Sequence, residues 1–155
     1  MKTNREIGNA VVALQKAWAF VRLEWVRAFP FGPTLILAEV FRAPETQAAY
    51  HAQGRKPLEE VNRLRKVADL AAINASENKV VTYRQAGTSK HELLPSRAID
   101  IMVMKNGQIS NDPIYYRKLA DLLRAHNPKI VWGGDWDGDQ RSDDEKFVDM
   151  PHFEI

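Results

Sequence analysis

Hydrophobic positions divide the chain into helical and extended segments. Residues 5–29 carry apolar side chains at helical spacing, namely Val11, Leu14, Trp18, Val21 and Trp25. This spacing predicts a long amphipathic helix. It could describe a basic helix on a membrane surface, but a domain of this size needs such faces for its core. We therefore expect the helix to pack against the rest of the chain.

Further elements follow from short apolar runs and turn residues. Residues 34–41 are apolar and short, which predicts a buried strand, and a second strand is expected over 77–83. Residues 42–55 and 56–75 predict two helices, each with a proline near its start. Gly54 lies near the C-terminal end of the first of them, where glycine is typical.

The second half of the chain has the clearest strand. In residues 97–104, Ile99, Ile101 and Val103 alternate with Asp100 and Met102, which predicts a strand with one buried face. An Asn-Gly pair at 106–107 then predicts a hairpin turn. A helix capped by Asp112 is expected over 111–128, and a strand over 129–134.

Composition limits the classes of protein that need to be considered. With 155 residues, 45% of them hydrophobic, we expect one domain over residues 1–155 that includes helix 5–29. The net charge is +2, from 22 basic and 20 acidic residues, with no concentrated basic face, so no nucleic-acid partner is expected. Cysteine is absent, so a zinc site would need His, Asp or Glu ligands.

No apolar stretch is long enough to cross a bilayer or to serve as a signal peptide. We therefore expect synthesis in the cytoplasm and no stable membrane association. A monomeric protein is also expected.

Eight carboxylates crowd into residues 133–155. Asp135, Asp137 and Asp139 match the first ligands of an EF-hand calcium loop, but Gln140 stands where that loop needs glycine and Lys146 where it needs glutamate. An EF-hand is therefore not expected. Weak cation binding by the acidic loop 135–145 and a plain solvated loop both remain open.

His152 suggests different chemistry, because Asp149 precedes it by three positions. A catalytic zinc ion needs a few N or O ligands, an open position for water and a nearby base. Other candidate ligands are His91 in a Gly/Ser loop and Asp100, whose charge within an apolar strand is costly to bury unless it is paired. Pairing of Asp100 with an arginine, or an open sheet edge, is the alternative.

These residues resemble a known family. "SKHELLPSRAID", "VWGGDW", "DMPHFE" and "FRAPETQAAYHAQGR" resemble the motifs of the zinc D-Ala-D-Ala carboxypeptidase/L-alanoyl-D-glutamate endopeptidase family, known as M15 or VanY-like peptidases. The phage endolysin branch is the most similar. The resemblance implies an α+β fold of the Hedgehog/DD-peptidase type, with a small, mainly antiparallel sheet flanked by helices.

The resemblance also implies roles for individual residues. His91, Asp100 and His152 would bind one Zn²⁺ ion, Asp149 would be the general base, and Arg42 would steady the polarised carbonyl oxygen of the substrate. Four more residues complete this set: Ser89 and Trp136 along the substrate groove, and Asp135 and Glu154 as residues that orient ligands. His51 and His126 match no motif position and are expected to serve packing or the surface.

The implied substrate is the stem peptide of bacterial peptidoglycan. An L-alanoyl-D-glutamate endopeptidase, released to the wall by a phage holin, is the favoured interpretation. A D-Ala-D-Ala carboxypeptidase of wall remodelling and a non-catalytic peptidoglycan-binding module are the alternatives. One departure concerns the loop from His91 to Asp100, which is longer than usual in the family and has Ser96-Arg97 in place of a Gly-x pair. The shape of the pocket beside this loop is therefore open.

Overall fold

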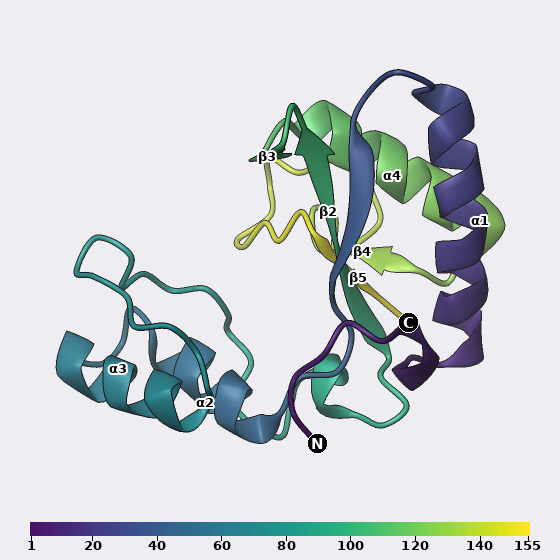
Figure 1. The fold of residues 1–155 in the computed structure, drawn as a ribbon. Coiled ribbons are helices and arrows are strands. Elements are labelled where there is room, and N and C mark those ends of the chain that lie inside the picture. The colour runs from purple at the N-terminus through teal and green to yellow at the C-terminus, as the bar shows by residue number, and fades with distance from the viewer.

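The computed structural model describes residues 1–155 and shows an antiparallel sheet with helices packed on one face (Figure 1). The helices are α1 (Val12–Ala28), α2 (Pro44–Ala52), α3 (Leu58–Val67) and α4 (Pro113–His126), with short 3-10 helices η1 (Ile7–Asn9) and η2 (Lys90–Glu92). The strands are β1 (Thr34–Glu39), β2 (Ala98–Lys105), β3 (Gln108–Ser110), β4 (Val131–Trp132) and β5 (His152–Glu154). The expected α+β class with a small antiparallel sheet is confirmed.

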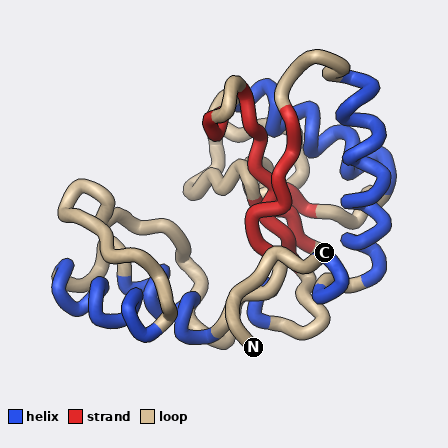
Figure 2. The backbone as a smooth tube through the Cα atoms, in the orientation of Figure 1, coloured by secondary structure: helices blue, strands red, loops and turns tan.

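Strand β2 is the centre of the sheet. The strand order is β1-β2-β5-β4, and β3 pairs with the end of β2 beyond β5. Helices α1 and α4 lie side by side against this sheet, whereas α2 and α3 form a separate arm (Figure 2). No helix has the length and apolar character needed to cross a bilayer.

The core lies between the sheet and helices α1 and α4. Ile99, Ile101 and Val103 of β2 are fully buried there, as their alternation predicts. Phe153, the middle residue of β5, is also fully buried, and burying such a ring contributes roughly 1.5–3 kcal/mol. Residues that alternate with these, including Asp100, therefore lie on the opposite face of the sheet.

The first helix is shorter than expected. Helix α1 begins at Val12, and the segment before it pairs with the loop at Ser96 instead of continuing the helix. Ser96 N–H donates to the Asn9 carbonyl, and Val11 N–H donates to the Ser96 carbonyl. These tertiary hydrogen bonds replace the helical ones that periodicity alone predicted, so the boundary at residue 5 was wrong.

The arm also differs from expectation. Helix α3 ends at Val67, not at residue 75, and Asp69 adopts a positive φ of 60°. Residues 77–83 do not form a strand, so that prediction was wrong. Their carbonyls accept hydrogen bonds from side chains instead of from a neighbouring strand, for example Thr82 from Arg55.

Other local predictions are confirmed. Asn106 and Gly107 both have positive φ and join β2 to β3. Asp112 caps α4 by accepting a hydrogen bond from Ile114 N–H at 3.0 Å. The predicted strand over 129–134 shrinks to β4, and β5 was not predicted because its three residues are too few for a periodic pattern.

Candidate active site

Sheet register places three acidic and basic side chains in one row. Glu39 of β1 lies opposite Asp100 of β2, and Asp100 lies opposite His152 of β5. An irregularity between Leu37 and Glu39 shifts the register of β1 just before this point. The neighbours of Asp100 along β2 face the core, so the row lies on the open face of the sheet.

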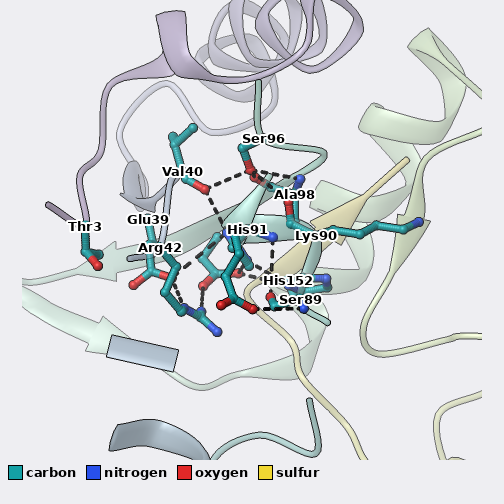
Figure 3. A network of polar contacts seen from close by, with 12 residues as sticks. Thr3, Glu39, Val40, Arg42, Ser89, Lys90, His91, Ser96, Ala98 and His152 are labelled. Atoms are coloured by element: carbon teal, nitrogen blue, oxygen red, sulfur yellow. Dashed lines mark hydrogen bonds and ion pairs between the residues drawn. The ribbon is translucent and has the colours of Figure 1, made fainter. Parts of the chain in front are cut away.

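His91 reaches this row from η2. Ser89 precedes η2 and forms a capping box with Glu92. The Ser89 hydroxyl accepts a hydrogen bond from the backbone N–H of His91, and the Glu92 carboxylate accepts one from the backbone N–H of Ser89. The backbone of His91 is held by the backbone of Arg42, whose amide N–H donates to the His91 carbonyl at 3.0 Å. His91 is only 1% exposed, so its ring has a fixed orientation (Figure 3).

Three potential ligand atoms converge at the row. The distances are 3.1 Å from His91 Nε2 to Asp100 Oδ1, 3.1 Å from His152 Nδ1 to Asp100 Oδ1, and 3.2 Å between the two histidine nitrogens. They form a nearly equilateral triangle. The sequence-predicted ligands, 61 positions apart at most, are therefore brought together.

Both histidines are oriented by their second ring nitrogen. His91 Nδ1 donates to the Val40 carbonyl at 2.9 Å, because a carbonyl can only accept. His152 Nε2 lies 3.1 Å from Glu154 Oε2 and donates to that carboxylate. The nitrogens that remain, Nε2 of His91 and Nδ1 of His152, point at the triangle.

This donor set fits a zinc ion. Ligand atoms about 2.0–2.1 Å from a tetrahedral zinc ion lie about 3.3 Å from one another, close to the separations observed. Two imidazole nitrogens and one carboxylate oxygen are ligands that zinc accepts in catalytic sites. A zinc ion held by these three side chains would keep a position for water or substrate, as catalytic zinc sites do. His91, Asp100 and His152 can thus hold one metal ion.

Arg42 contacts Asp100, the carboxylate of the triangle. Its Nε forms an ion pair with Glu39, its Nη1 donates to Gln47 Oε1 at 2.8 Å, and its Nη2 lies 3.4 Å from Asp100 Oδ2. Arg42 therefore holds one oxygen of Asp100 while the other faces the histidines. Glu39 and Gln47 were not identified from sequence, although a lone glutamate within "TLILAEVF" is the same signal that singled out Asp100.

The charges of the site reinforce this arrangement. Burial alone would raise the pKa of Asp100, but His91 and His152 hold it well below its usual range. Burial would lower the pKa of His152, but hydrogen bonds to Asp100 and Glu154 raise it to about 9. The pocket is thus built to hold positive charge between these side chains, which a cation would supply in place of a proton.

Asp149 lies beside His152 with a different environment. Burial and the charge of Asp100 raise the pKa of Asp149 to about 6. The turn that carries it packs on Gly133: a Cβ at that position would lie 2.4 Å from the Asp149 carbonyl oxygen and 3.1 Å from His152 Cβ. Glycine at 133 therefore allows the backbone close approach that brings Asp149 next to the triangle.

A cavity of about 510 Å³ opens beside the triangle. Both histidines, Asp149 and Arg42 line it, together with Ser89 and Trp136. The indole of Trp136 lies over His152, with ring centroids 5.5 Å apart, and its Nε1 donates to the Phe147 carbonyl. The cavity could receive a peptide beside an ion held by the triangle.

The two residues expected to orient ligands have different surroundings. Glu154 contacts His152 and also pairs with Lys90 at 3.1 Å. Asp135 has no hydrogen bond to any of the three ligands; instead Arg124 of α4 donates to its Oδ2 at 2.7 Å. Asp135 therefore anchors the acidic loop to α4, and the expectation that it orients a ligand is not supported by its contacts.

The remaining histidines lie away from the triangle. His126 ends α4 and stacks on Phe20 with ring centroids 4.7 Å apart, and His51 lies in the last turn of α2. In the acidic loop, oxygens of Asp135, Asp137 and Asp139 lie within 4.8 Å of one another. Cation binding by that loop stays a prediction.

Comparison with known proteins agrees with this site. The model of the family described as phage L-alanyl-D-glutamate peptidase matches residues 58–155, well over half of the chain. The protein therefore belongs to this family of peptidases, which act on peptidoglycan. The match includes all three triangle residues and Asp149, but not Arg42.

A solved structure extends the comparison to the rest of the fold. The chain is similar to the L-Ala D-Glu endopeptidase ChiX of Serratia marcescens, with 15% sequence identity and a TM-score of 0.52. The alignment covers 96% of this chain and 82% of that one. At this identity the likeness concerns the fold alone. No curated protein matches the chain.

Proposed function

We propose that the protein is a zinc-dependent endopeptidase that hydrolyses the L-alanyl–D-glutamate bond in the peptidoglycan stem peptide. The observation that carries this proposal is the triangle of His91, Asp100 and His152, whose three ligand atoms lie 3.1–3.2 Å apart at the edge of a cavity. Membership of the peptidase family supports this choice of substrate.

Zinc held by this triangle would polarise the scissile carbonyl and increase the acidity of water beside it. Asp149 would accept the proton of the attacking water and pass it to the nitrogen of the leaving amine. Its pKa of about 6 lies near neutral pH, which suits a group that takes up and releases a proton. A nearby cation favours its ionised form, which is the form that acts as base.

Arg42 would also serve the reaction. It lines the cavity, and its guanidinium holds Asp100 through Oδ2. The same charge would offset the negative charge that grows on the carbonyl oxygen, an effect worth about 3 kcal/mol for comparable donors. Ser89 would act mainly through η2, because its hydroxyl caps the turn that carries His91.

The family to which the chain belongs supports the L-alanyl–D-glutamate bond as the one that is cut. A phage lysin that reaches the wall after holin-type release is the biological setting we propose, and a D-Ala-D-Ala carboxypeptidase is the alternative. The two activities give different products: the endopeptidase frees the amine of D-glutamate, whereas the carboxypeptidase frees D-alanine.

Mass spectrometry of purified peptidoglycan digested by the zinc-loaded protein tests the proposal. We expect stem peptides that begin with D-glutamate, and we expect EDTA to abolish them and added zinc to restore them. Free D-alanine as the main product would favour the carboxypeptidase instead. Binding to peptidoglycan without any new amine would show a non-catalytic module.

A further inference from the structure

Cationic side chains in the cavity fall into two kinds. Four of them line it: Arg42, Arg84, Lys90 and Lys146. Arg42 is paired with Glu39 and Asp100, and Lys90 is paired with Glu154. The other two have no carboxylate oxygen within ion-pair distance, so, unlike Arg42 and Lys90, they have no donor already bound to a carboxylate of the protein.

Arg84 is the better placed of these two for an anion. Lys146 directly follows Asp144 and Glu145, which line the same cavity and make its surroundings negative. No acidic residue occurs between positions 79 and 91, where Arg84 lies. A guanidinium also binds a carboxylate through two parallel hydrogen bonds, which an ammonium does not.

The backbone of Arg84 is tied to the metal centre. Gln47, which is fully buried, donates from Nε2 to the Arg84 carbonyl at 2.6 Å and accepts at Oε1 from Arg42 at 2.8 Å. One side-chain amide therefore links Arg84 to the residue that holds Asp100. The position of Arg84 relative to the triangle is fixed, while its side chain remains exposed.

The substrate provides a matching anion. D-glutamate has two carboxyl groups, and at most one of them can continue the stem peptide. Cleavage of the L-alanyl–D-glutamate bond therefore always occurs beside a free carboxylate on the leaving side, unless that group is amidated. We propose that Arg84 binds this carboxylate and makes the enzyme selective for D-glutamate over its amidated form. This inference rests on the proposed endopeptidase activity.

Two synthetic peptides test the assignment. Both contain the L-alanyl–D-glutamate bond, and they differ only in whether the free carboxylate is replaced by a carboxamide. The zinc-loaded protein should cleave the carboxylate peptide with a kcat/KM about tenfold to a hundredfold higher, as expected for a charge-assisted hydrogen bond. In Arg84→Gln this ratio should fall to within about twofold of one.

Matched variants separate recognition from general charge effects. Arg63→Gln removes the same charge from an exposed position in α3 outside the cavity, so it should keep the wild-type ratio. Arg84→Lys should retain part of the ratio, since a charge remains without its bidentate geometry. Thermal unfolding of Arg84→Gln should match that of the wild type, because the side chain is exposed.

Several outcomes would overturn the inference. If Arg84→Gln slows both peptides equally, Arg84 acts only on the structure. If Lys146→Gln removes the ratio and Arg84→Gln does not, Lys146 binds the carboxylate. If the wild-type enzyme cuts both peptides equally well, the proposed endopeptidase activity stands, but the enzyme does not recognise the free carboxylate and the inference about Arg84 is refuted. If it cuts neither peptide, the endopeptidase activity itself is refuted, and this inference with it.

Discussion

His152 and Glu154 lie on the same face of strand β5, two positions apart, with the imidazole Nε2 3.1 Å from the carboxylate. Phe153, between them, points into the core. The spacing H-x-E thus has a simple cause: a strand places alternate residues on one face, so a candidate ligand and the group that orients it come from the same three residues.

Replacement of Glu154 should weaken metal binding without removing a ligand. In Glu154→Gln the ionic partner of His152 is lost, and we expect zinc affinity to fall about 10–100-fold, as for comparable outer partners. Competition with a chromogenic zinc chelator measures this change. Glu59→Gln, at an exposed position of α3, is the control and should bind zinc like the wild type. An unchanged affinity in Glu154→Gln would contradict the role given to Glu154.

Loss of a ligand should remove the metal altogether. His91→Ala and His152→Ala each leave two of the three triangle atoms, so elemental analysis should find about one zinc per chain in the wild type and almost none in either variant. Zinc in thousandfold excess over its dissociation constant should stabilise the wild type by about 4 kcal/mol. EDTA should therefore lower the melting temperature of the wild type but not that of His152→Ala.

Asp149→Asn should separate metal binding from catalysis. The amide keeps the size of the side chain but cannot accept a proton, so we expect a full complement of zinc and a kcat reduced by about 10²–10⁴-fold. Peptide hydrolysis and metal content should be measured on the same preparation. Loss of zinc in this variant would mean that Asp149 is a ligand and not the base.

Gly133→Ala tests the close packing of the turn that carries Asp149 against Gly133. The new Cβ would meet the Asp149 carbonyl oxygen at 2.4 Å and Asp149 Cβ at 3.0 Å, so the turn must move. We expect a loss of roughly 1–3 kcal/mol in the free energy of unfolding, measured by urea denaturation, together with weaker zinc binding. Gly8→Ala has no atom within 4 Å of its new Cβ and should change neither property.

Sequence patterns anticipated the triangle better than its surroundings. Asp100 was identifiable because a charge interrupts a strand whose other alternate residues are apolar, and His91 and His152 because histidine is scarce and occurs in family motifs. The hydrogen bond from His91 to Val40 could not be predicted, since it joins a side chain to a backbone carbonyl 51 positions away. Arg84 carries no local pattern and becomes visible only through the cavity that it lines.

The errors in secondary structure have related causes. Residues 77–83 have the composition of a strand, but side chains of the arm, such as Arg55, take the place of a neighbouring strand. The start of α1 was placed too early because Ser96 offers the segment 9–11 hydrogen bonds that compete with the helix. In both places, partners distant in sequence decide the local conformation.

The carbonyl of Val40 accepts from both Ser96 Oγ and His91 Nδ1, at 2.9 Å each. This one oxygen lies outside the region matched by the family, as does Arg42. A fragment trimmed to residues 58–155 would thus retain the three triangle residues but lose the groups that orient two of them, together with α1 and β1, which form part of the core and the sheet. Transplanting this peptidase into a fusion lysin therefore requires the leading third of the chain as well, because that third completes the core and aligns the triangle.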